Sequence, residues 1–373
     1  MPIYKMEGSK NGKQKYRVRI NYIDNFGKDR QIDRVAYGST EAKDLERKLA
    51  HEVKNSKPIA RMTVQNLYDE YIKAMSHEIR ESSLKKSDTI LKNHILPYFG
   101  NTPLDKLTAP AVQRWKLYIE EKGLQIKTKQ NIYSGFRALL NWGIKLDYLQ
   151  NNILTKVGNF KSADIIKKEI SYYTAEEYKL FSKASKDYAQ TSNHMIDWDF
   201  YVFFSIAFYT GLRKGEIHAL KWSDIDGVYL NVSRSITQKL TGADRETPPK
   251  NKSSIRTLQI PQPLIDILNE HEERYKSVKG FSDNYRICGG ERCLRDTSIE
   301  KMNGKFAELA GVKKIRIHDF RHSHASLLAN SGINIQEVAR RLGHADIKMT
   351  WNTYSHLYPK EEERAIEILN KIV

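Results

Sequence analysis

The 373-residue sequence contains only two cysteines, Cys288 and Cys293, with four residues between them. A structural zinc site needs four ligands, and no second cysteine pair supplies the other two, so we expect both to be free thiols. The sequence also lacks an apolar run long enough to span a bilayer, and its first residues do not resemble a secretory signal. These absences argue against a secreted disulfide-rich protein and a membrane protein, and we expect a cytoplasmic location.

Acidic residues are too few to balance the basic ones. The chain has 62 Lys and Arg against 45 Asp and Glu, which gives a net charge of +17. Solubility does not require such an excess, and it attracts polyanions, nucleic acid above all. A chain of this length is expected to form two or three domains with ample core.

Polar residues near the C-terminus form a pattern that packing alone does not explain. If the residues after His318 are helical, His318 and Arg321 face the same point; His344 follows a Leu-Gly pair, and Tyr354 comes ten residues later. A guanidinium matches two phosphate oxygens, and a tyrosine hydroxyl becomes nucleophilic when cations and a base ease its ionisation. Because no carboxylate cluster stands nearby to hold divalent metal, the pattern predicts transfer of a phosphodiester to tyrosine without metal or other cofactor.

These residues, with the Leu-Gly pair before His344, resemble the C-terminal signature of the tyrosine recombinases, the phage and transposon integrase family. That family needs a further arginine and a lysine upstream. The Tyr-Thr-Gly-Leu stretch before Arg213 resembles the first arginine motif. The lysine normally lies on a β-hairpin, a character shared by residues 248–258; we favour Lys250 and keep Lys252 as the alternative.

The resemblance implies a site-specific DNA recombinase that integrates and excises a mobile element through a 3′-phosphotyrosyl intermediate and a Holliday junction. In such an enzyme the tyrosine attacks the scissile phosphate, the two arginines hold its oxygens, and the lysine protonates the leaving oxygen. The first histidine assists the tyrosine proton, and the second donates to the phosphate or positions the tyrosine. The implied catalytic set is Arg213, Lys250, His318, Arg321, His344 and Tyr354.

Other polar residues of the same stretches have no counterpart in the signature. We expect three additional histidines and a second tyrosine to be structural: His322, His324, His356 and Tyr358. Glu216, three residues after Arg213, is expected to orient that arginine or to cap its helix. The resemblance also implies a homotetramer on double-stranded DNA with core and arm sites, and it leaves an excisionase or a host DNA-bending protein open as a partner. Two alternatives remain: a non-catalytic architectural DNA-binding protein and a type IB topoisomerase-like relaxing enzyme.

Residues 1–57 read as three strands and one helix, which resembles the arm-type DNA-binding domain of phage integrases. Strand alternation places Arg17 and Arg19 opposite Val18, on a face suited to a DNA groove or simply to solvent. Residues 58–157 read as four helices and resemble the core-binding domain of the same family. Their candidate phosphate contacts are Lys85, Lys86, Lys127 and Lys129.

An interdomain linker is expected at residues 158–171, followed by a catalytic domain with a C-terminal tail at residues 172–373. A capping box that begins at Thr174 should start its first helix. The apolar tail packs either in cis or on a neighbouring protomer. The expected fold class is multidomain: a small three-stranded β-sheet plus helix, an all-α core-binding bundle, and a mainly α (α+β) catalytic domain.

Overall fold

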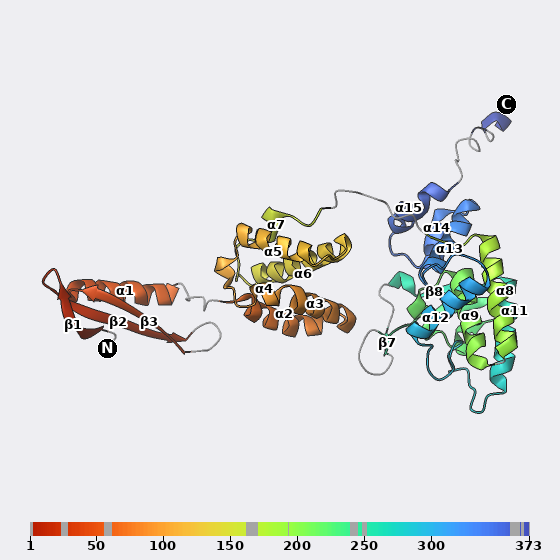
Figure 1. The fold of residues 1–373 in the computed structure, drawn as a ribbon, viewed down its shortest axis with the longest axis horizontal. Coiled ribbons are helices and arrows are strands. Elements are labelled where there is room, and N and C mark those ends of the chain that lie inside the picture. The colour runs from red at the N-terminus through yellow and green to blue at the C-terminus, as the bar shows by residue number, and fades with distance from the viewer. Residues whose placement is uncertain are drawn as a thin grey trace. The chain divides into compact units, whose positions relative to one another are not determined.

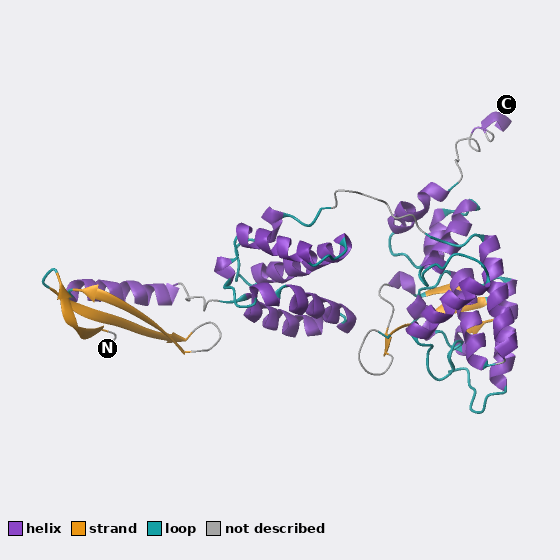
Figure 2. Ribbon diagram, viewed as in Figure 1, coloured by secondary structure: helices purple, strands orange, loops and turns teal. Residues whose placement is uncertain are grey.

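The computed structural model describes residues 3–23, 29–55, 62–161, 171–192, 194–238, 245–247, 252–358, 366 and 369–372 (Figure 1). The chain divides into two compact units, Met1–Ile165 and Ile166–Val373. Figure 2 shows that strands open the first unit, whereas the rest of the described chain is mainly helical. This matches the expected fold class.

The N-terminal segment is an antiparallel sheet covered on one face by a helix. The elements are β1 (Ile3–Lys10), β2 (Lys13–Ile23), β3 (Asp29–Tyr37) and α1 (Ser39–Asn55), with the strands in the order β1-β2-β3 (Figure 1). Val18 and Ala36 pack against Ala42 of α1. Because Arg17 and Arg19 alternate with Val18 along β2, they lie on the other face of the sheet, as predicted.

The helical part of the first unit has its own core, built around Trp115 and Phe136. Its elements are α2 (Val64–Glu78), α3 (Glu81–His94), α4 (Leu96–Phe99), η1 (Leu104–Lys106), α5 (Ala109–Glu121), α6 (Ile126–Lys145) and α7 (Ile153–Val157). Thr63 caps α2 through reciprocal hydrogen bonds with Asn66. Pro97 lies in the first turn of the short helix α4, where a proline lacks only an N–H that needs no helical partner.

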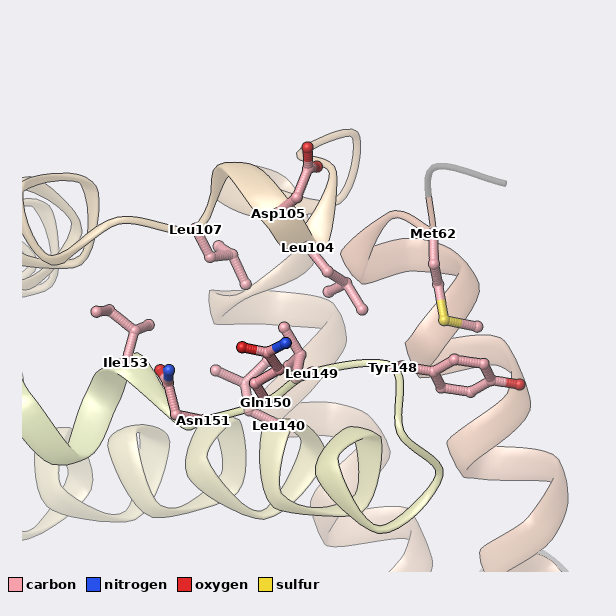
Figure 3. Close-up of a pocket in the computed structure, with 10 residues that line it drawn as sticks. All are labelled: Met62, Leu104, Asp105, Leu107, Leu140, Tyr148, Leu149, Gln150, Asn151 and Ile153. Carbon is pink, nitrogen blue, oxygen red and sulfur yellow. The ribbon is translucent and has the colours of Figure 1, made fainter. Parts of the chain in front are cut away.

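A cavity of about 610 Å³ lies within this helical part (Figure 3). Apolar side chains from η1, the end of α6 and the segment that leads to α7 form its wall, and amide groups border it. Its lining is Met62, Leu104, Asp105, Leu107, Leu140, Tyr148, Leu149, Gln150, Asn151 and Ile153. This lining contains no lysine, arginine or histidine, so the cavity is not suited to a phosphate.

The second unit is organised around α9 (Met195–Thr210), which is mostly apolar and is buried on all sides from Trp198 to Phe208. Neighbouring helices surround it, with α8, α11 and α13 in contact with it (Figure 1). The other helices are α8 (Ala175–Ser192), α10 (Lys214–Ala219), α11 (Gln262–Lys276), α12 (Asp296–Leu309), α13 (Asp319–Asn330), α14 (Ile335–Leu342) and α15 (Ile347–Tyr354). The Thr174 and Glu177 side chains accept each other's backbone N–H bonds ahead of α8, as the predicted capping box requires.

Two small sheets complete the second unit. Strands β4 (Ile225–Asp226), β5 (Tyr229–Val232) and β8 (Arg256–Gln259) form one, and β6 (Ser235–Thr237) pairs with β7 (Arg245–Thr247) in the other. Short 3₁₀ turns are η2 (Trp222–Asp224), η3 (Lys252–Ser254), η4 (Ser355–Leu357) and η5 (Asn370–Ile372). Most of the C-terminal tail after residue 358 lies outside the described residues. The expectation that it packs in cis or on a neighbouring protomer therefore also concerns residues that the structure does not describe.

Both cysteines are buried, and neither forms a disulfide. Across the described ranges, no helix combines the length and the apolar character that crossing a membrane requires.

Candidate active site

The first arginine motif lies where α9 ends and the chain turns back. Gly211 terminates α9 with a φ of 65°, and a Cβ at this position would lie 2.7 Å from His324 Cδ2, so the turn requires glycine. Arg213 then stands at the N-terminal cap of α10. Glu216 accepts hydrogen bonds from the Arg213 backbone N–H at 3.0 Å and from its Nη1 at 2.9 Å. Glu216 therefore both caps the helix and orients Arg213, as expected.

Arg321 lies on α13, with only 3% of its surface exposed. Its Nη1 donates to the Gly211 carbonyl at 2.9 Å and its Nη2 to the Leu342 carbonyl at 2.7 Å. Arg213 Nη2 donates to the neighbouring Gly343 carbonyl at 3.4 Å. Both predicted arginines thus converge on the turn after α14, although 108 positions separate them in the sequence.

A third arginine, Arg256 on β8, belongs to the same cluster and was not predicted. Its Nη2 donates to Glu216 Oε2 at 2.9 Å, and its Nε donates to the Arg341 carbonyl at 2.8 Å. Strand alternation contains a signal for it, because Arg256 shares the inward face of β8 with the buried Leu258. An arginine in such a position needs a buried partner.

The three guanidiniums surround one buried carboxylate, and two of their positive charges therefore remain unbalanced within the group. Burial, and then the charge of Arg213, lowers the pKa of Arg321 to about 9. Burial alone would raise the pKa of Glu216, but the charge and hydrogen bonds of Arg256, followed by Arg213, hold it below its usual value. A phosphodiester would supply a negative charge and oxygen acceptors to this cluster, which makes the cluster suitable for binding one.

His318 stands at the N-terminal cap of α13, and its ring packs against that of His322 one turn later. The ring centroids are 5.2 Å apart and the rings are almost perpendicular, at 87°. Although His318 reaches solvent, the protein packed around its ring, followed by the charge of Arg321, lowers its pKa. His318 is thus close enough to Arg321 to sense its charge, as the three-residue spacing predicts.

His344 follows Gly343, which ends α14 in the left-handed conformation with a φ of 64°. A Cβ on Gly343 would lie 2.8 Å from Arg256 Nη1, so the close turn brings His344 beside the arginines. Its Nδ1 lies 2.8 Å from the hydroxyl of the buried Thr350 on α15. Burial, and then the charge of Arg321, lowers the pKa of His344 to about 4, so this imidazole is neutral near pH 7.

Tyr354 is the last residue of α15, and only 2% of its surface is exposed. Its ring packs against Ala325 and Leu342, and its hydroxyl lies 2.5 Å from His322 Nδ1. Burial raises the pKa of Tyr354, although the charge of Arg321 opposes this effect. The hydroxyl is therefore protonated, and its hydrogen-bond partner is His322, which we had expected to be structural.

The remaining predicted positions vary in how far the structure describes them. Lys250 lies outside the described residues, and Lys252 begins η3, but its side chain lies outside them too. His324, expected to be structural, is buried, and its Nδ1 lies 2.9 Å from the Phe208 carbonyl. Within the described ranges, no group of three or more histidine, cysteine or acidic side chains is arranged to hold a metal ion.

The candidate DNA contacts of the first unit are not equally available. Lys85, Lys86 and Lys127 are exposed. In contrast, Lys129 forms an ion pair with Glu120 and keeps only 13% of its side chain exposed. This pair removes much of the charge that Lys129 could offer to a phosphate.

On the N-terminal sheet, Arg19 forms a two-nitrogen ion pair with Asp33, its neighbour across β2 and β3, with both distances 3.2 Å. Arg17 lies opposite Tyr4 on one side and Val35 on the other. The outward face therefore combines one balanced arginine with one that has apolar and aromatic neighbours.

Two family models match the chain. Residues 172–361, half of the sequence, match "Phage integrase family", and residues 63–118 match "Phage integrase, N-terminal SAM-like domain". The ICEBs1 integrase of Bacillus subtilis is 27% identical over an alignment that covers all of both chains. The transposase from transposon Tn916 of Enterococcus faecalis is 24% identical over 95% of this chain and 92% of its own.

Solved structures with a similar fold include the Tn1549 transposon integrase in complex with transposon right end DNA. It has a TM-score of 0.67 and 21% identity, over 84% of this chain and all of the other. A lambda integrase tetramer bound to a Holliday junction has a TM-score of 0.57 and 18% identity, over 95% of this chain and 94% of the other. With a family model that covers half of its residues, the chain belongs to the phage integrase family.

Proposed function

We propose that this chain, a tyrosine recombinase by family, cleaves and rejoins DNA at specific sites by transferring a phosphodiester to Tyr354. The observation that carries this proposal is the convergence of Arg213, Arg321 and Arg256 around a single carboxylate, with the Tyr354 hydroxyl close enough to Arg321 to sense its charge. A cationic group with two unbalanced charges beside a tyrosine hydroxyl suits attack on a phosphodiester.

Each residue of the predicted catalytic set receives a role in this proposal. Tyr354 attacks the phosphorus to give a 3′-phosphotyrosyl link and a free 5′-hydroxyl. Arg213 and Arg321 hold the non-bridging oxygens, where one such donor contributes about 3–4 kcal/mol to transition-state stabilisation. His318, at the start of α13, assists removal of the tyrosine proton. His344 donates a hydrogen bond to the phosphate.

The general acid is Lys250, with Lys252 as the alternative, because a protonated amine is needed to supply the leaving 5′-oxygen with a proton. In a substrate that carries sulfur in place of that 5′-oxygen, the leaving group is a thiolate, which departs without a proton. Such a substrate should restore cleavage by the Lys250→Ala variant to near the unmodified rate and leave Lys252→Ala unaffected. Rescue of Lys252→Ala alone would move the role to Lys252, and rescue of neither would overturn the lysine assignment.

The proposal divides the chain into four segments. Residues 1–57 bind arm sites through the sheet face that carries Arg17 and Arg19, and residues 58–157 bind core DNA, with Lys85, Lys86 and Lys127 as phosphate contacts. Residues 158–171 link them to the catalytic domain at 172–373. Separate hydrophobic cores and the two matched family models support this division.

We further infer a homotetramer that exchanges strands on two duplexes through a Holliday junction, in the cytoplasm of a bacterial host at its nucleoid. The tetrameric lambda integrase on a Holliday junction and the Tn1549 integrase with a circular intermediate support this assembly by analogy. An excisionase or a host DNA-bending protein remains a candidate partner that sets the direction of the reaction.

The first experiment looks for a covalent complex on a denaturing gel after incubation, in EDTA, with labelled DNA from the ends of the element that encodes the chain. We expect a band that Tyr354→Phe abolishes and that the matched variant Tyr358→Phe retains, since Tyr358 lies one turn later and packs against the same small cluster. A band that persists in Tyr354→Phe would assign the nucleophile elsewhere. Tight binding without any covalent band on verified sites would favour an architectural protein.

A further inference from the structure

One polar contact of Tyr354 has no role in the mechanism above. The His322 Nδ1 lies 2.5 Å from the Tyr354 hydroxyl oxygen, and the two ring centroids are 5.6 Å apart. His322 directly follows Arg321 on α13 and lies one turn after His318. Tyr354 ends α15, so this hydrogen bond joins the helix of the phosphate-binding arginine to the helix of the nucleophile.

The direction of this hydrogen bond follows from the protonation of both groups. Burial, and then His318, lowers the pKa of His322 to about 4, so the imidazole is neutral near pH 7. Burial raises the pKa of Tyr354, so its hydroxyl keeps its proton. A neutral imidazole nitrogen accepts and a phenol donates, which orients the Tyr354 O–H toward Nδ1 and assigns the imidazole proton to Nε2.

We propose that His322 takes the proton of Tyr354 when this tyrosine attacks the scissile phosphate, a role that rests on the function proposed above. The tyrosine oxygen bonds to phosphorus as its proton passes to His322 Nδ1. The bond from phosphorus to the 5′-oxygen breaks, and that oxygen takes a proton from the lysine. In the second half-reaction a strand hydroxyl bonds to phosphorus as its proton passes to the neutral lysine. The bond from phosphorus to the tyrosine oxygen breaks, and His322 returns its proton to that oxygen. His318, whose ring contacts that of His322, then positions the His322 ring and does not contact the tyrosine proton itself.

The charges around His322 tie this proton transfer to DNA binding. The charged and titratable groups that face its ring are His318, Asp319, Arg316, Arg321 and Tyr354. The histidine and the two arginines lower the pKa of His322, and Asp319 raises it. A phosphate held by Arg321 adds a negative charge beside them, which raises the pKa of the imidazole and makes it a better acceptor.

Single-turnover cleavage tests this role in the full chain, with a nicked suicide DNA substrate that lets the released strand diffuse away. We expect His322→Ala to slow formation of the covalent complex by about 10²- to 10⁴-fold at unchanged DNA affinity. Free imidazole should restore part of the rate, and substituted imidazoles of higher pKa should restore more. His356→Ala, on the 3₁₀ turn that follows Tyr354, is the matched control and should cleave at the unmodified rate.

A second variant, His322→Gln, keeps a polar acceptor of similar size but cannot carry a proton. This variant should cleave DNA slowly, and the substrate with sulfur in place of the 5′-oxygen, which rescues the lysine variant, should not speed it up. Its pH–rate profile should lose the acid limb. Unmodified rates in His322→Gln, or slow cleavage in His322→Ala that no imidazole relieves, would overturn the role of His322. If the unmodified chain forms no Tyr354-dependent complex, the proposed function itself fails; if it does, only the role of His322 is in question.

Discussion

The Arg256→Met substitution tests whether buried charge balance holds the arginine cluster together. Methionine fills much of the same space without a guanidinium, so Glu216 loses a partner at 2.9 Å and the Arg341 carbonyl loses its donor at 2.8 Å. The Arg256 and Glu216 side chains are 4% and 5% exposed, so water does not replace these bonds. Removal of one partner from such a pair costs about 3–5 kcal/mol, which is roughly 10²- to 10⁴-fold in the folding equilibrium.

Urea unfolding of the full chain, followed by hydrogen exchange in peptides from α9 and α13, measures the free energy of unfolding of the second unit. The matched control is Arg340→Met. Arg340 binds Glu337 through two nitrogens at 2.7 Å, but the two side chains are 51% and 41% exposed. An exposed pair contributes about 0–1 kcal/mol. Equal losses in the two variants would refute the argument from burial.

The same pair predicts a dependence on pH. Because the pKa of Glu216 is lowered in the folded chain, its contribution to stability is complete above the unfolded-state pKa of about 4.3. The contribution is lost as the pH falls through the lower folded-state pKa. The difference in stability between the unmodified chain and Arg256→Met should therefore shrink at low pH. Adding Glu216→Gln to Arg256→Met should recover part of the loss at neutral pH, since it removes a buried charge that has lost one of its two arginine partners.

Three further substitutions test other parts of the structure. Gly211→Ala should lower the thermal stability more than Gly227→Ala: both glycines have positive φ, which costs about 1–2 kcal/mol with a Cβ, but only at Gly211 would that Cβ overlap a side chain. Burial lowers the pKa of His324 to about 3, so below about pH 6.5 unfolding adds a proton at this residue, whose share of the fall in stability is about 1.4 kcal/mol per pH unit; His324→Gln should remove that share of the slope. Asp33→Asn releases Arg19 and should steepen the salt dependence of DNA binding by up to about 0.9 in log–log slope; an unchanged slope would show that Arg19 contacts no phosphate.

Local signals in the sequence predict much of the fold because they act over a few residues. The cap at Thr174 depends on a side chain and a backbone N–H three positions later, and it forms as predicted. The alternation around Val18 likewise fixes which face of the N-terminal sheet meets α1. The short helices α4 and α7 were missed because four or five residues are too few to reveal a period of 3.6.

The proximity of the candidate site residues could be predicted where they share one helix at a fixed spacing. It could not be predicted where tertiary packing brings distant residues together. His318 and Arg321 share a helix, so their proximity follows from geometry. Arg256 on β8 approaches Glu216 on α10 across 40 positions of sequence, and tertiary packing, not a local pattern, brings them together. The lysine could not be assigned because hairpin length, which sets its register, is not encoded in a local pattern.

The role of His322 depends on both kinds of information. Its four-residue spacing from His318 predicts that the two imidazoles meet, and the structure adds that Tyr354 meets the second of them. We infer that Arg321 connects the two functions: it would hold the phosphate, and its charge adds a small electrostatic restraint to the burial and the His318 ring, which do most to lower the pKa of His322. The phosphate that satisfies the arginine would also remove this restraint. On this argument DNA binding and activation of the tyrosine are one electrostatic event, so a variant that weakens phosphate binding should slow cleavage even when saturated with DNA.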